Sequence, residues 1–154
     1  MKAAAGTLKK VHAIRLEPGE DVMQSLQTFC EEHHIGNGAI LTGVGSLRGC
    51  SYFDPTEIPD RPGYYGYGDP IELPCPIELI AMNGIICTEA DGKPSLHIHA
   101  AFADENGKEF GGHLNVGNLV LATVELVIGE FEGIRMSRGI DPDRGVPVFT
   151  PIQL

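Results

Sequence analysis

Apolar residues near the N-terminus recur at the spacing of an amphipathic helix. They fall at i, i+4, i+7 and i+8, at Val22, Leu26, Phe29 and Cys30. This spacing places all four on one helix face. Glu20 and Asp21 precede the pattern, where acidic side chains favour a helix N-terminus, and Gly36 follows it. The pattern predicts a helix over residues 20–34 that packs its apolar face on the rest of the protein.

The rest of the chain changes to short apolar or alternating runs, which are typical of strands. These runs cover residues 8–16, 39–44, 47–53, 77–88, 96–103 and 119–128. Asp91-Gly92 and Asn106-Gly107 are hairpin signals between them. We expect residues 54–70 to form a loop and the tail from Gly133 to add at most one short strand. The prediction is one α+β domain, residues 1–154, with one or two helices flanking a mainly antiparallel sheet of about six to eight strands.

Composition and charge narrow the function classes. The chain has 154 residues and a net charge of −10, which argues against a phosphate-binding surface. It has no apolar run long enough for a transmembrane helix and no signal-peptide pattern at the N-terminus. Its four cysteines have no CxxC spacing: Cys30, Cys50, Cys75 and Cys87. We interpret them as reduced, buried side chains of a cytoplasmic protein.

Three histidines within 17 residues are the main chemical feature of the sequence. His97 and His99 lie at i and i+2 on a predicted strand, so both leave the same face. His113 follows the next hairpin signal and Gly111-Gly112, and a return strand could bring it to that face. Three neutral imidazoles favour zinc or another divalent transition metal, with a fourth position open to water or substrate. The alternative is a polar stripe on a half-exposed strand.

Other polar residues have simpler interpretations. His33 and His34 would complement the dipole at the helix C-terminus, and His12 would be structural. Tyr64, Tyr65 and Tyr67 would pin a loop or line a subunit contact, and the alternative is that they stack on a base or a sugar. Glu125 is unusual because it lies inside an apolar run, where a carboxylate needs a partner or a nearby metal. We predict Glu125 and Glu78 as supporting or acid–base groups, and for Glu125 the alternative is a surface-facing or ion-paired carboxylate. No catalytic nucleophile is evident.

Several motifs together resemble the plants-and-prokaryotes-conserved (PPC) domain. They are Leu96-His97-Ile98-His99, Gly111-Gly112-His113-Leu114, Thr123-Val124-Glu125-Leu126, Gly43-Val44-Gly45-Ser46-Leu47 and Ile77-Glu78-Leu79-Ile80-Ala81-Met82-Asn83-Gly84. The similarity covers about residues 8–150. The resemblance implies a homotrimer built on an antiparallel sheet. In fold the family is also similar to acetolactate decarboxylase, a zinc enzyme with a three-histidine site, which supports His97, His99 and His113 as ligands.

The resemblance leaves two classes of function open. One is a metal-binding homotrimer that acts on or senses a small molecule; as an enzyme it would be a metal-dependent lyase or hydrolase. The alternative is a DNA-associated regulatory or oligomerisation module, as in plant relatives that carry an AT-hook. This chain has no Arg-Gly-Arg-Pro core, and Cys75-Pro76-Ile77 stands where plant members have Gly-Arg-Phe. We therefore expect no direct DNA binding by the isolated chain, and no membrane partner.

Overall fold

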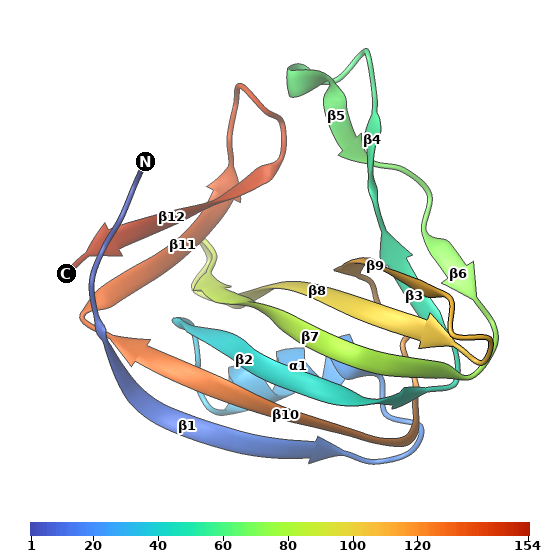
Figure 1. Ribbon diagram of the computed structural model, residues 1–154. Helices are drawn as coiled ribbons and strands as arrows, with labels where there is room; N and C mark the ends of the chain where they lie inside the picture. Colours follow the sequence, from blue (N-terminus) through green and yellow to red (C-terminus); the bar gives the residue numbers. More distant parts are fainter.

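A strongly curved sheet forms most of the molecule in this computed structural model, which describes residues 1–154 except for the side chain of Pro62 (Figure 1). Its order is β1-β10-β2-β7-β8-β9-β3-β6, with β11 joined to β7 and β12 joined to β11. The strands of this sheet are β1 (Thr7–Leu16), β2 (Gly38–Leu47), β3 (Cys50–Phe53), β6 (Ile71–Leu73), β7 (Ile77–Thr88), β8 (Pro94–Asp104), β9 (Glu109–Leu114), β10 (Val120–Glu132), β11 (Ile134–Ile140) and β12 (Pro147–Gln153). All pairs but β11 with β7 are antiparallel. The predicted α+β class is confirmed.

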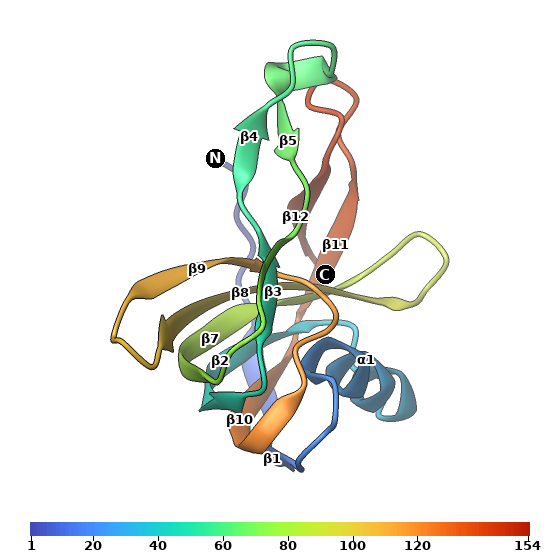
Figure 2. The same ribbon diagram turned by 90° about the vertical axis from the view of Figure 1, so that its right-hand side faces the viewer.

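The helix α1 (Val22–Glu32) covers one face of the sheet, as Figure 2 shows from the side. The Asp21 side chain caps it by accepting a hydrogen bond from the Gln24 backbone N–H at 3.0 Å. Val22, Leu26 and Cys30 are fully buried against the sheet, and Phe29 is partly buried beside them. The predicted helix and its packing face are therefore correct, with bounds two residues shorter at each end.

Three expectations about the strands are wrong. The main sheet has ten strands, more than the six to eight expected. Residues 54–70 contain a two-stranded hairpin, β4 (Pro55–Glu57) and β5 (Tyr65–Tyr67), with a short 3-10 turn η1 (Pro62–Tyr64) between them. The tail from Gly133 forms two strands, β11 and β12. The side chains of β4 are exposed, so no alternation marks that strand. Proline in β12 is tolerated because β12 pairs on one side only.

These two hairpins rise from the same end of the molecule (Figures 1 and 2). Their tips meet where Gly63 approaches the Arg144 backbone. A Cβ atom on Gly63 would lie 3.3 Å from the Arg144 Cα, and Gly63 has a φ of +76°. Only glycine adopts this conformation without strain. Gly63, Arg144 and Gly145 all line the space between the hairpins.

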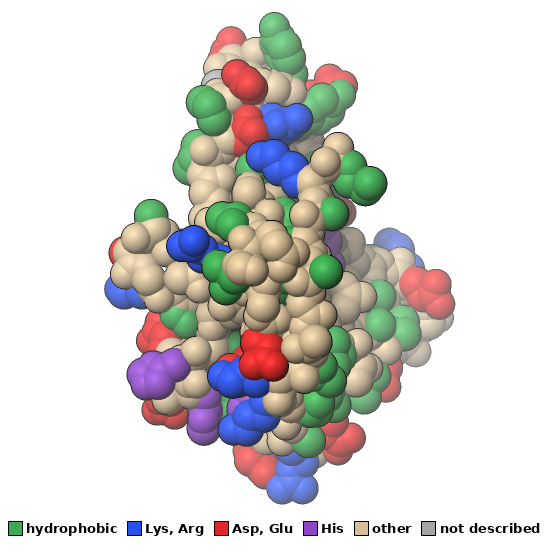
Figure 3. Space-filling view, turned by 90° about the vertical axis from the view of Figure 1, so that its left-hand side faces the viewer, with side chains coloured by type: hydrophobic (Ala, Val, Ile, Leu, Met, Phe, Trp, Pro, Cys, Tyr) green, Lys and Arg blue, Asp and Glu red, His purple; other side chains and the backbone are tan. Residues whose placement is uncertain are grey.

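The sheet face away from α1 carries exposed apolar side chains. Val11, Leu41, Val44, Ile80 and Leu121 are each between 41% and 51% exposed. Figure 3 shows hydrophobic side chains gathered along the lower right-hand edge, on the side away from the helix. Among the described residues, no helix is long and apolar enough to cross a membrane.

All four cysteines are free, and three of them are buried. Burial raises the pKa of Cys30 to about 12 and the pKa values of Cys50 and Cys87 to about 11. These thiols stay protonated at neutral pH, which makes them poor nucleophiles and poor metal ligands.

Candidate metal centre

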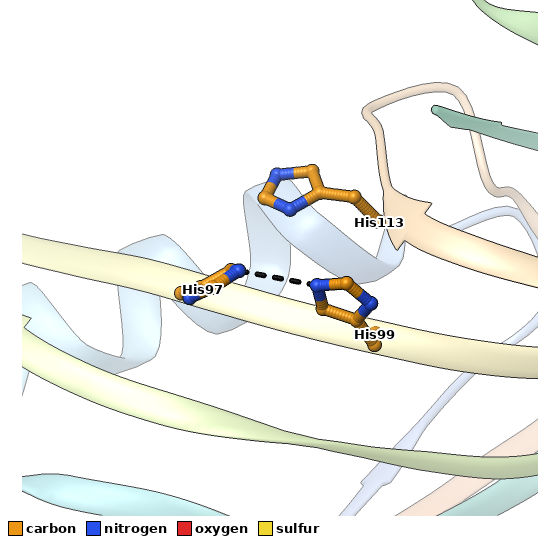
Figure 4. Close-up of side chains that lie close together, drawn as sticks. All are labelled: His97, His99 and His113. Carbon is orange, nitrogen blue, oxygen red and sulfur yellow. Dashed lines mark hydrogen bonds between the residues drawn. The ribbon is translucent and has the colours of Figure 1, made fainter. Parts of the chain in front are cut away.

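The β8–β9 ladder brings three imidazoles together (Figure 4). His97 and His99 leave the same face of β8, as their i, i+2 spacing predicts. His113 on β9 lies directly opposite His99 in the antiparallel register. The return strand after Asn106-Gly107 thus places a third histidine on the face that holds the first two.

The three rings are close enough to share one ion. Nε2 of His97 lies 3.1 Å from Nε2 of His99, and one ring nitrogen of each histidine lies within 4.8 Å of the others. A tetrahedral ion with metal–nitrogen bonds of about 2.0–2.1 Å needs nitrogens about 3.3 Å apart. The pair on β8 already has this separation, and small rotations of His113 would complete it. The donor set and its spacing therefore fit a transition-metal ion such as zinc.

Gly111 and Gly112 let β9 approach its neighbours closely. A Cβ on Gly112 would lie 2.5 Å from both the Phe53 carbonyl oxygen and Asp54 Oδ1. A Cβ on Gly111 would overlap the backbone of Ala100 on β8. Neither glycine has a positive φ, so close approach, not an unusual backbone conformation, requires glycine here. The position of His113 depends on this tight packing.

The electrostatics of the site keep two imidazoles neutral. Burial lowers the pKa of His97 to about 4, with further contributions from the positive charge of Arg138 and from His99. Burial also lowers the pKa of His113 to about 4, followed by the effects of His97, His99 and Arg138. Both rings are therefore uncharged at neutral pH, the form that binds metal ions.

Tyr67, on β5, contacts the site directly. Its hydroxyl lies 3.2 Å from Nδ1 of His113, which leaves Nε2 as the free nitrogen of that ring. When Nε2 binds a metal, neutral His113 carries its proton on Nδ1 and donates it to the Tyr67 oxygen. The sequence analysis assigned Tyr67 to a loop or subunit contact and missed this role. No sequence signal could find it, because 46 residues separate the two partners.

Arg138, on β11, is the second residue that sequence reasoning missed. Its guanidinium is close enough to His97 and His113 to lower both pKa values. The tail from Gly133 was expected to contribute little structure, so nothing pointed to this arginine. Pairing of β11 with β12 and a bridge from Ser137 to Thr88 on β7 carry it to the site.

The structure does not bring Glu78 or Glu125 to the histidines. Glu78 lies on β7 opposite Ala103, which is four residues, or about 13 Å, along β8 from His99. Glu125 lies on β10 opposite Arg15 and is separated from β8 by β2 and β7. Both are exposed on the sheet surface. For Glu125, a surface location is the alternative that the sequence analysis had also allowed.

The remaining histidines lie around the end of α1. His33 is the C-cap residue and donates its backbone N–H to the Phe29 carbonyl. Its ring lies tilted against those of Phe29 and His12, with centroids 4.2 Å and 5.9 Å away. His12 Nε2 lies 3.8 Å from a carboxylate oxygen of Glu130. These contacts are structural, and the group is not part of the three-histidine cluster.

The chain belongs to the Plants and Prokaryotes Conserved (PCC, or PPC) domain family, whose model matches residues 3–132. A curated relative, the bifunctional protein GlmU of a Synechococcus strain, is 31% identical over 136 residues, which are 88% of this chain and 20% of GlmU. The chain thus spans about a fifth of the length of the curated relatives that it matches.

Solved structures share the whole fold. A PPC protein from Pyrococcus horikoshii is 25% identical with a TM-score of 0.81, and 100% of each chain is covered. A metal-containing protein from Archaeoglobus fulgidus is 24% identical with a TM-score of 0.80, covering 97% of this chain and 99% of its own. A Bacteroides thetaiotaomicron protein provisionally described as DNA-binding is 21% identical with a TM-score of 0.76, covering 94% and 96%. At these identities, the similarity to the last two proteins establishes only that this chain shares their fold.

Proposed function

We propose that this PPC-domain protein binds one zinc-like ion through His97, His99 and His113 and uses it to act on or sense a small molecule. The observation that carries the proposal is the convergence of the three rings from two paired strands, with one nitrogen of each within 4.8 Å of the others. A solved relative with the same fold is itself a metal-containing protein.

Three protein ligands leave a fourth coordination position for water or a small molecule. His97 also lines a cavity of about 660 Å³ between the two projecting hairpins, so a molecule in that cavity can reach the ion. When bound there, such an ion supplies Lewis acidity that polarises a carbonyl or lowers the pKa of a bound water. The contribution of Tyr67 is to hold the tautomer and orientation of His113.

The test is the metal content of protein purified without chelators or a metal-affinity column. We expect one zinc or similar ion per chain by elemental analysis. His99→Ala should lose it while circular dichroism stays native-like, because the exposed His99 ring is outside the core. His34→Asn is the matched control: His34 is exposed with a φ of +56°, which Asn tolerates. Full metal occupancy in His99→Ala would refute the proposal.

The same proposal includes assembly as a homotrimer. The sheet face away from α1 is apolar and exposed in a single chain, and the residues on it include Val11, Val44 and Ile80. Burying such a face against identical copies removes apolar surface from water. Light scattering at micromolar protein should give three times the mass of 16.5 kDa. A monomer mass would contradict this part of the proposal and leave the metal site unaffected.

A further inference from the structure

A second group of polar residues lies beside the candidate metal centre, in the cavity between the two hairpins. This cavity of about 660 Å³ is bounded by the β4–β5 hairpin, the β11–β12 hairpin and His97. Three arginines line it: Arg61, Arg138 and Arg144. They are three of the 11 Lys and Arg residues in a chain of net charge −10. No Asp or Glu lies among the described lining residues, so the cavity has the opposite charge to the rest of the protein.

Among the described residues, only one of these arginines has a side-chain nitrogen that lacks both a hydrogen-bond partner and solvent. Arg144 is mostly exposed and pairs with Asp141 at 2.8 Å. Arg61 is exposed. Arg138 is partly buried, and its Nε is fully buried without a hydrogen-bond partner among the described atoms. A buried guanidinium N–H without an acceptor is costly and rare. Arg138 lines the cavity and has no ion-pair or side-chain hydrogen-bond partner among the described residues, so the rest of its guanidinium is available to a ligand oxygen there.

The walls of the cavity suggest the rest of the ligand. Tyr65, Tyr67, Val146 and Pro147 present rings and aliphatic groups to the same space. Small-molecule sites typically combine apolar walls with a few polar groups that fix orientation. A ligand that matches this lining carries one anionic group on a compact apolar body.

We propose that this cavity binds a small carboxylate, with Arg138 as the residue that holds the carboxylate group. The planar guanidinium offers parallel N–H donors that match the two oxygens of a carboxylate. One partly buried, unpaired arginine suits a single negative charge, whereas phosphate sites usually add lysines or a helix N-terminus. The inference rests on the proposed function in one respect, because the far end of the ligand would reach the ion that His97 helps to bind.

Charge balance supports the same conclusion. Imidazole ligands bring no negative charge to a divalent cation, and Arg138 adds another positive charge near His97 and His113. The described lining residues supply no carboxylate to offset these charges. An anionic ligand between Arg138 and the metal site would supply the missing negative charge.

The experiment compares benzoate, its neutral analogue benzamide and inorganic phosphate by ligand-detected NMR titration of the full chain. We expect benzoate to bind about tenfold or more tightly than benzamide and more tightly than phosphate. Arg138→Gln should weaken benzoate binding by about tenfold or more. Arg138→Lys should weaken it less, because lysine keeps the positive charge and loses only the paired N–H donors of the guanidinium. Arg135→Gln is the matched control, since Arg135 is exposed on the same strand and does not line the cavity.

The outcomes separate this inference from the metal proposal. Benzoate binding that depends on Arg138 in a protein that holds no zinc would support the carboxylate site and refute the metal site. Stoichiometric zinc with equal binding of benzoate and benzamide would refute only the carboxylate site. Tighter binding of phosphate, or a folded Arg138→Gln variant with unchanged benzoate binding, would overturn the proposal.

Discussion

His99 and His113 are direct partners across the antiparallel β8–β9 ladder. With His97 two residues before His99 on β8, this pairing fixes three imidazoles at the corners of a triangle whose ring centroids are 5.0–5.3 Å apart. The triangle is therefore set by strand register, since a shift of one residue would send His113 to the opposite face of the sheet.

Replacing Gly112 by alanine should disturb that register. The added Cβ would lie 2.5 Å from backbone and side-chain atoms of β3 and Asp54, so β9 must move. We expect a loss of about 1–3 kcal/mol in unfolding free energy, and weaker zinc binding because His113 is displaced. Thermal unfolding and zinc titration would measure the two effects.

Gly139→Ala is the control for this prediction. Gly139 lies in β11, and a Cβ there would meet nothing within 4 Å. Gly139→Ala should change neither the unfolding free energy nor the zinc affinity appreciably. Unchanged zinc affinity in Gly112→Ala would show that the position of His113 does not depend on close approach of β9.

The stability of the metal-free protein should fall as the pH is lowered from about 6.5 to about 4. Burial holds the pKa values of His97 and His113 near 4 in the folded protein, whereas the ordinary value is 6.5. The unfolded chain therefore binds more protons in this interval, and protonation favours unfolding. Above pH 6.5 the contribution is fully present, and below pH 4 it is lost.

Denaturant unfolding of chelator-treated protein at several pH values would measure this effect. His97→Gln removes one of the two groups and should give a shallower pH dependence over the same interval. Parallel curves for the two proteins would contradict the lowered pKa of His97. Zinc binding should also persist to a lower pH than it would with histidines of ordinary pKa, because protons compete less with zinc for His97 and His113.

Removing the metal should leave the protein folded but less stable. The main core lies between α1 and the sheet and does not include the three histidines. Adding zinc should raise the Tm progressively, by a free energy of about 2.7 kcal/mol when free zinc exceeds its Kd a hundredfold. Differential scanning calorimetry would follow the shift, and His99→Ala should show none. Unfolding on chelation would make the ion a folding requirement instead.

Duplex DNA should bind the isolated chain more weakly than typical non-specific affinities of about 10⁻⁴–10⁻⁶ M at physiological salt. The net charge is −10, and three of the arginines face the cavity between the hairpins. Figure 3 shows acidic and basic side chains intermixed on one face. Fluorescence anisotropy at two salt concentrations would measure binding. A tight, salt-sensitive Kd would favour the DNA-associated alternative.

The local sequence pattern determined much of the fold and part of the candidate site. Helical spacing from Val22 to Cys30 identified α1 and its buried face, and the run from 77 to 88 has the bounds of β7. The i, i+2 spacing of His97 and His99 placed both on one face, because strand geometry alone sets that relationship. The Asn106-Gly107 signal and His113 then predicted the return strand.

Tertiary structure decided which segments that are distant in the sequence lie side by side. Strand β4 is exposed throughout and has no alternation, because its pairing with β5, and not a buried face, holds it in place. Tyr67 and Arg138 reach the histidines only after the β4–β5 and β11–β12 hairpins pack beside β8 and β9. Glu125, which the sequence singled out, is exposed on β10. The strand order places β2 and β7 between β10 and the strand that holds His97 and His99. Local periodicity contains no information on strand order, so the surroundings of the three histidines depended on the complete fold.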